Sequence, residues 1–235
     1  MSDYLTLCQD LRRETTDSGT GPSAVTGNTG ELARFVSWIA SAWQDIQSDR
    51  DHWRWMQKYF TVNTVSGTGE YAYNATSLID TVSLAAISRF SRWRTGPHDF
   101  KCYLSSSGVA GEYFLKFLSW EDFKYLYRKG TQTNAPPVHF SVDDTNKFVL
   151  GPKPNAVFVV SGGYTIGPQI LAADGDTPEM PSAYHALIVY HAMLKYGFHR
   201  VAPEAIQRAQ IEGSRLRFAL ERDQLPPITT GGSLA

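Results

Sequence analysis

Residues 180–227 read MPSAYHALIVYHAMLKYGFHRVAPEAIQRAQIEGSRLRFALERDQLPP and predict a helical hairpin from Pro181 to Pro226. Pro181 and Ser182 suit a first helical turn, whose N–H groups have no partner inside the helix. Pro203 begins a second helix in the same way, because proline is well tolerated at a first helical position. The stretch carries no set of side chains that chemistry would need, so it directs attention to assembly.

The first helix of the hairpin is expected over residues 183–198. Leu187, Tyr190 and either Met193 or Leu194 follow the three-and-four spacing that collects side chains on one face of a helix. Gly197 continues this spacing and fits the end of the helix. The pattern therefore predicts about four helical turns with one apolar side.

The second helix, residues 203–222, has a narrow apolar line that contains small residues, which would let another backbone come close. This line is formed by Ile206, Ala209, Gly213, Leu216 and Leu220. Glu204, Arg208 and Glu212 recur every four residues and are expected to form ion pairs along an exposed face. That face is either solvated or a contact between subunits, and the pattern leaves both interpretations open.

The composition excludes several classes of protein. A formal net charge of −1, from 22 basic and 23 acidic residues, gives no electrostatic reason for general binding to nucleic acid or membranes. Cys8 and Cys102 lie in no metal-ligand spacing and favour a reducing compartment. No run approaches the roughly 18 apolar residues of a membrane span, and residues 1–13 are too polar for a signal peptide. We therefore expect a protein outside the membrane that is not secreted by that route.

The N-terminal part of the chain is expected to be mainly helical. Apolar residues spaced by three and four predict a short helix over residues 4–15 and a long core helix from Glu31, for which Thr29 is a candidate cap. Residues 16–30, between these helices, are rich in Gly, Ser and Thr. They lack the lysine that follows the last glycine of a phosphate-binding loop, so they predict a plain connection.

Aromatic residues are abundant, with 6 Trp and 12 Tyr in the chain. Such residues supply large contact areas in cores and at interfaces alike. In DHWRWM, residues 51–56, they alternate with basic residues in a way that could stack nucleic-acid bases. A single such cluster in a neutral chain is better explained by packing of Trp53 and Trp55 beneath the strands that follow.

The middle of the chain changes to the two-residue period of β-strands. Residues 60–65 and 70–73 flank a glycine-bearing turn and predict a hairpin. Residues 100–105 alternate in the same way, as do residues 138–150 on either side of an Asp-rich turn at 143–146. These segments predict half-buried antiparallel strands.

Residues 156–160 form a continuous apolar run and predict a more fully buried strand, after which Gly162–Gly163 suggest a bend or a bulge. Ser119 is expected to cap a short helix whose buried side includes Phe123. This helix lies between the two groups of predicted strands. It is the helical insert of an otherwise β-rich region.

Helices, then strands with a helical insert, then helices predict an α+β fold: a helical, ring-forming bundle with an inserted antiparallel β region. We expect residues 1–58 and 181–226 to form the helical core. Residues 59–180 would form the β-rich insertion, and residues 227–235 a C-terminal tail.

Side chains that could perform chemistry do not occur in a recognisable arrangement. His185 and His191 are six apart, which places them on different sides of a helix and not on one zinc-facing stripe. The acidic turn at 143–146 offers calcium-type ligands but lacks the spaced series of an EF-hand loop, so a hairpin turn explains it. No nucleophile signature is present. We therefore expect no catalytic, cofactor-binding or metal-binding residues and no enzyme activity.

Several segments together resemble the head-to-tail adaptor proteins of tailed bacteriophages, also called connector or neck proteins. They are the N-terminal LCQDLRRETTDSGTGPSAVTGNTGELARFVSWIASAWQDIQ, the aromatic DHWRWM, the central WEDFKYLYRKG, and the closing MPSAYHALIVYHAMLKYG and ALERDQLPP. The similarity extends from about Leu5 to Pro226.

The resemblance implies a structural virion protein that forms a ring, usually of twelve copies, between the portal protein of the capsid and a tail tube or nozzle protein. Double-stranded DNA would pass through the lumen without specific binding during genome ejection. Helices 31–48, 183–198 and 203–222 would form the ring wall, and the hairpin loops would face neighbouring subunits or the tail. The subunit would be made in the host cytoplasm and located in the neck of the virion.

The resemblance also implies a C-terminal extension that reaches toward the portal protein. Leu225, Ile228 and Leu234 are the only sizeable apolar residues in this part of the chain, so they are the candidate partner-binding residues. The competing interpretation is an aromatic-rich recognition module of a virion or cell. Such a module would bind carbohydrate, for example, as a monomer through clustered Trp and Tyr.

Overall fold

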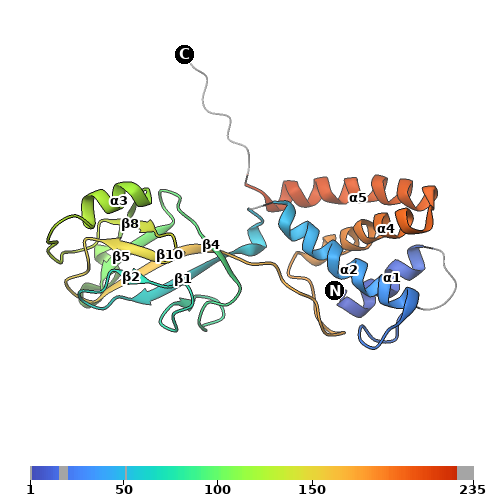
Figure 1. Ribbon diagram of the computed structural model, residues 1–235, viewed down its shortest axis with the longest axis horizontal. Coiled ribbons are helices and arrows are strands. Elements are labelled where there is room, and N and C mark those ends of the chain that lie inside the picture. Colours follow the sequence, from blue (N-terminus) through green and yellow to red (C-terminus); the bar gives the residue numbers. More distant parts are fainter. Residues whose placement is uncertain (1, 16–20, 51, 227–235) are drawn as a thin grey trace, which may run out of the picture. The chain divides into compact units, whose positions relative to one another are not determined.

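Two compact units make up the chain, which the computed structural model describes over residues 2–15, 21–50 and 52–226 (Figure 1). The helical unit comprises the described residues of Met1–Trp55 and Pro168–Ala235, and the β unit comprises Met56–Gly167. Helices and antiparallel sheets in one chain confirm the expected α+β class.

The helical unit is built around α4 (Ala186–Arg200). This helix packs against α1 (Tyr4–Glu14), α2 (Gly30–Asp49) and α5 (Pro203–Gln224), and the short turn η3 (Ser182–Tyr184) leads into it. Because its three neighbours cover different sides, its buried residues do not form a single stripe. They are Leu187, Ile188, Val189, Ala192, Met193, Tyr196 and Gly197. The expected helices are confirmed, although Thr29, which precedes α2, makes no side-chain capping hydrogen bond.

Residues 168–180 lie along the helices, although the sequence analysis places them in the β-rich insertion. The backbone N–H of Tyr4 donates to the carbonyl oxygen of Asp176 (2.8 Å). The buried Gln47 side chain forms two hydrogen bonds with the backbone of Gln169: its amide donates to the carbonyl oxygen (3.1 Å) and its oxygen accepts from the N–H (2.7 Å). These contacts attach an extended segment that has no secondary structure of its own.

Gly197 does not end the helix, contrary to the sequence interpretation. Helix α4 continues to Arg200 and ends at Val201, which adopts the left-handed conformation with φ 54°. Gly197 instead lies where α4 meets α5. A Cβ atom on Gly197 would stand 2.5 Å from Cγ1 of Ile206, so only glycine permits this approach of the two helices.

The β unit contains two sheets. Strand order in the first is β3-β1-β10-β5-β6, with β4 also paired to β10, and strand order in the second is β2-β9-β8-β7. In chain order the elements are η1 (Arg54–Met56), β1 (Gln57–Asn63), β2 (Glu70–Tyr71), β3 (Ile79–Asp80), β4 (Phe90–Trp93), β5 (Phe100–Leu104), η2 (Ser105–Gly111), β6 (Tyr113–Phe114), β7 (Lys116–Phe117), α3 (Trp120–Tyr127), β8 (His139–Val142), β9 (Phe148–Gly151) and β10 (Phe158–Ile166). The core of the unit is aromatic, and the ring of Phe60 lies 5.0 to 5.6 Å from those of Trp93, Phe100 and Phe148.

Several local predictions for the β unit are confirmed. Strand β5 lies in the expected segment but ends one residue earlier, at Leu104, and β8 pairs with β9 in antiparallel register. In the turn between β8 and β9, a carboxylate oxygen of Asp143 accepts the backbone N–H groups of Thr145 (2.8 Å) and Lys147 (2.9 Å), which is the turn-stabilising role expected of it. Helix α3 begins after Ser119, whose hydroxyl oxygen accepts the N–H of Asp122 (3.2 Å).

The predicted hairpin of residues 60–65 and 70–73 is wrong. Strand β1 pairs with β10 and β3, whereas β2 pairs with β9 in the other sheet. Both edges of β1 are thus occupied by strands that are distant in sequence. The glycine-bearing turn is held differently too, because the N–H of Gly67 donates to the carbonyl oxygen of Pro154 (2.7 Å).

Gly162 and Gly163 do not bend the chain, since β10 runs through both residues with continuous pairing to β1. Gly162 is required by packing: a Cβ atom there would stand 2.7 Å from the ring of Phe60 and 2.9 Å from that of Phe100. The irregularity in β10 lies later, between Thr165 and Ile166. In both units, therefore, a glycine that suggests a break in the sequence instead allows close packing.

The contrast between two helical glycines provides a test of the α4–α5 crossing. We expect Gly197→Ala to destabilise the chain by about 1–3 kcal/mol, because the added methyl group overpacks the contact with Ile206. The matched variant Gly213→Ala should be neutral or stabilising by up to about 1 kcal/mol, because its Cβ would meet only the Cβ of Tyr190 at 3.6 Å and alanine favours helix. Urea unfolding of both variants measures the difference, and equal stabilities would contradict this account of the crossing.

Candidate partner-binding surface

A cleft of about 250 Å³ opens between α2, α4 and α5 in the helical unit. Its floor is apolar and its rim is polar. The apolar residues are Ile46, Trp53, Leu187 and Leu220, and the polar ones are Asp45, Ser48, Asp49, His191 and Arg217. An apolar hollow with a few polar groups at its edge is the usual form of a binding site, so this cleft is the candidate functional site.

Trp53 forms the part of the floor that follows α2. Its indole N–H donates to the carbonyl oxygen of Ile46 (2.9 Å), and its ring stacks on Trp55 with centroids 4.6 Å apart. Trp55 in turn lies 6.5 Å from Trp43 of α2. Trp53 and Trp55 thus pack against α2, which corrects the expectation that they pack beneath the following strands. These tryptophans are not displayed for base stacking or for a carbohydrate ligand.

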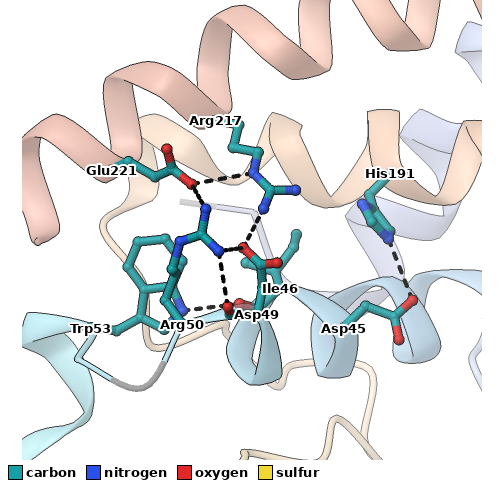
Figure 2. A network of polar contacts seen from close by, with 8 residues as sticks. All are labelled: Asp45, Ile46, Asp49, Arg50, Trp53, His191, Arg217 and Glu221. Atoms are coloured by element: carbon teal, nitrogen blue, oxygen red, sulfur yellow. Dashed lines mark hydrogen bonds and ion pairs between the residues drawn. The ribbon is translucent and has the colours of Figure 1, made fainter.

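Charged side chains connect α2 with α5 along one edge of the cleft (Figure 2). The Arg217 guanidinium forms ion pairs with Asp49 and, at 3.3 Å, with Glu221. Arg50 completes the group by binding Glu221 at 3.0 Å and Asp49 at 3.5 Å. Because these side chains are partly exposed, each pair contributes at most about 1 kcal/mol. Their main effect is to fix the position of α5 relative to α2.

Asp45 binds two partners from α4 on the other edge. Its carboxylate lies 2.7 Å from Nζ of Lys195 and 3.3 Å from Nε2 of His191. Burial by itself raises the pKa of Asp45, but the hydrogen bond and charge of Lys195, with a contribution from His191, hold this pKa below its ordinary value. Burial also lowers the pKa of His191, despite the opposing charge of Asp45. The resting pair is therefore a carboxylate beside a neutral imidazole.

The residues of the cleft do not form a catalytic arrangement. The described part of the chain holds no group of three or more His, Cys, Asp or Glu side chains placed to bind a metal ion. Both cysteines are buried, and burial raises the pKa of Cys8 to about 12 and that of Cys102 to about 11, so neither is a thiolate nucleophile near neutral pH. What the cleft offers is an apolar surface with fixed charges at its rim, which suits the docking of a protein side chain.

A model of the family described as SU10 adaptor protein matches residues 2–227. The chain belongs to this family. The resemblance to phage head-to-tail adaptors is thereby confirmed, and the protein is a structural phage adaptor. No curated protein sequence matches the chain. Among the described residues of this adaptor, no helix has the length and apolar character needed to cross a membrane.

Leu225 is the one sequence-predicted site residue that the structure describes. It follows α5, is half-buried, and its N–H donates to the carbonyl oxygen of Glu221 (2.9 Å). Ile228 and Leu234 lie outside the described residues. A role of these three residues in binding a partner stays a prediction.

Sequence reasoning missed the cleft of the adaptor because its residues come from three separate helices. One signal was present: Asp45 and Asp49, and likewise Arg217 and Glu221, are spaced by four and so share a helix face. The predicted pairing of Glu204, Arg208 and Glu212 with one another is wrong. Arg208 binds Glu14 of α1, and Glu212 binds Arg215 at 3.0 Å.

The His191 contact predicts a pH dependence of the adaptor's stability. Because the pKa of native His191 is lowered, the unfolded chain binds more protons as the pH falls below about 6.5, so the free energy of unfolding decreases. We expect His191→Gln to flatten this decrease between about pH 7 and pH 5. The charges of Lys195 and Arg217, which also face His191, help to lower its pKa.

Thermal unfolding midpoints measured across that pH range check the prediction. His98→Gln, a change of an exposed histidine in the β unit, is the control and should leave the wild-type curve unchanged. His139 has a pKa lowered by burial as well, so a residual slope is expected in the His191 variant. A wild-type slope in the His191 variant would show that this residue does not carry the effect.

Proposed function

We propose that this adaptor forms a ring, most simply of twelve copies, that joins the portal protein to the tail and continues the DNA channel. Membership of the adaptor family over residues 2–227 carries the proposal. The subunit would occupy the neck of the virion after synthesis in the host cytoplasm, and it would have no catalytic role. Each subunit of a closed ring gains two neighbour interfaces and leaves none open, so a modest contact suffices for a stable assembly.

The surface of α5 supports a wall made of packed subunits. Ile211 and Phe218 are 61 and 68 % exposed, although the opposite side of the helix already packs within the subunit. A helix that is apolar on two opposite sides is normally covered on both. The exposed Ile211 and Phe218 thus support a subunit contact, which is one of the two interpretations that the sequence leaves open for this helix. In the proposed ring, the helical unit forms the wall.

The proposed lumen would carry double-stranded DNA without holding it. A formal net charge of −1 provides no general excess of cations for the phosphates. Each phosphate contact adds to affinity through the release of counterions, so a ring with few such contacts lets DNA slide during ejection. Tight binding of the DNA by the lumen would therefore oppose its passage through the channel.

Loops at one end of the β unit are suited to a protein partner in the tail or in a neighbouring subunit. Val65, Val109 and Val157 are 61, 70 and 47 % exposed in three loops that contain mostly small, uncharged residues. Two of these loops are attached to each other by the N–H of Ser105, which donates to the carbonyl oxygen of Val157 (3.0 Å). We propose that this β-rich insertion supplies the tail-facing contacts.

Imaging of purified chain with and without portal protein tests the ring. We expect ring-shaped oligomers of uniform copy number in native mass spectrometry or particle images, at least when portal rings are present. A chain that stays monomeric on portal rings and binds a glycan would overturn the proposal in favour of the recognition module. A monomer in isolation is expected if assembly requires the portal as template.

Removal of residues 226–235 is expected to weaken attachment to the portal while the subunit still folds. The more selective variant Ile228→Ser with Leu234→Ser should have the same effect, because it removes the apolar anchors and keeps the length of the segment. Thr229→Ser with Thr230→Ser is the matched control. Co-sedimentation with portal rings measures attachment, and normal head–tail joining in virions that carry the truncation would count against a portal tether.

A further inference from the structure

One turn of α5 contributes side chains to two opposite surfaces of the subunit. Leu220 is fully buried and lies in the floor of the cleft, whereas Phe218 is 68 % exposed. Residues two apart in a helix are separated by about 200° around its axis, so these side chains point away from each other. The cleft and the exposed phenylalanine therefore stand at the same level on either side of one helix.

The exposed surface has the composition of a contact site. Phe218 lies about seven residues, or two turns, from the exposed Ile211 on the same side of the helix. Arg222 lies one turn further on, is exposed, and has no hydrogen bond or ion pair to any of the described residues. Aromatic residues and arginine are both enriched at protein interfaces relative to the rest of the surface.

The cleft has the complementary chemistry. About 150 Å³ of apolar cavity is enough for a benzene ring, so a cleft of about 250 Å³ holds a phenylalanine side chain. Trp53 and Leu187 line the cleft with an aromatic ring and an aliphatic side chain, of which 1 and 5 % are exposed in the single subunit. At the rim, the side chain of Asp45 remains 48 % exposed despite its two partners, which leaves carboxylate surface for another cation.

We propose that Phe218 of one copy inserts into the cleft of the next copy, with Arg222 beside Asp45 of that copy. The inference rests on the proposed ring and specifies its subunit contact. Because donor and acceptor surfaces are different and lie on opposite sides of α5, the contact is heterologous and passes from copy to copy. A heterologous contact produces a ring when its rotation closes. In each copy, one side of α5 would then border the copy's own cleft, and the other side would contact the next copy.

Phe218→Glu tests the contact, because it places a carboxylate in an apolar cleft near Asp45. We expect the fraction of chain assembled on portal rings to fall by at least about tenfold. Tyr125→Glu is the matched control, since Tyr125 is an exposed aromatic residue (71 %) of the β unit. Both variants should keep the wild-type circular dichroism and unfolding midpoint, as the replaced side chains are largely exposed in the subunit.

Cysteine pairs report which surfaces meet. A chain with Ser48→Cys and a second chain with Arg222→Cys should form a disulfide-linked pair when mixed in rings, whereas neither chain alone should do so. The native Cys8 and Cys102 are fully buried and leave the background low. Wild-type rings are assembled under the same oxidising conditions as the reference.

The outcomes separate this contact from the ring itself. Wild-type yields of rings from Phe218→Glu, or intact rings without the Ser48→Cys to Arg222→Cys link, overturn the contact and leave the ring standing. A link from Ser48→Cys to Leu234→Cys instead would show that the C-terminal segment fills the cleft, and it would also overturn the contact. Wild-type chain that forms no ring even on portal protein contradicts the proposed function, and the contact with it.

Discussion

The burial of α4 between α1, α2 and α5 is the constraint on which the helical unit depends. A helix covered on three sides needs small residues wherever a neighbour comes closest, and Gly197 meets this need opposite Ile206. The cleft lies between α2, α4 and α5, and Trp53 and Leu220 are among its apolar lining residues. Partly exposed ion pairs lie at the rim of this cleft, whereas the apolar residues of its floor are buried.

The sequence was sufficient where structure is local. Three-and-four spacing found α1, α2, α4 and α5 within a few residues, and the cap at Ser119 and the turn at Asp143 followed from short-range hydrogen bonding. Sequence-based prediction failed where the role of a residue depends on a contact with a residue far away in the sequence. In the sequence, Gly162 and Gly197 cannot be told from glycines that form turns. Their role is to allow close packing, and it depends on side chains from other elements of the fold. The pairing of β1 with β10 joins residues about a hundred positions apart, and no local turn motif predicts such a pairing.

The candidate site shows the same limit in a different form. Asp45 and Asp49, or Arg217 and Glu221, each look like an ordinary exposed pair on one helix, and only the packing of three helices turns them into the rim of one cleft. The family resemblance, in contrast, could be recognised without a structure, because it depends on the sequences of whole segments. Function at the level of the adaptor class was therefore accessible from sequence, whereas the surface that would perform it was not.

The way the β unit is inserted has a consequence for its length. The first and last strands of this unit are paired with each other, with Gln57 opposite Thr165, so the chain leaves and re-enters the helical unit at neighbouring points. Paired residues of adjacent strands have Cα atoms only about 5 Å apart. The two ends of the insertion are therefore as close together as the ends of a short loop. An insertion joined in this way can change in length while the two points at which it joins the helices stay in place.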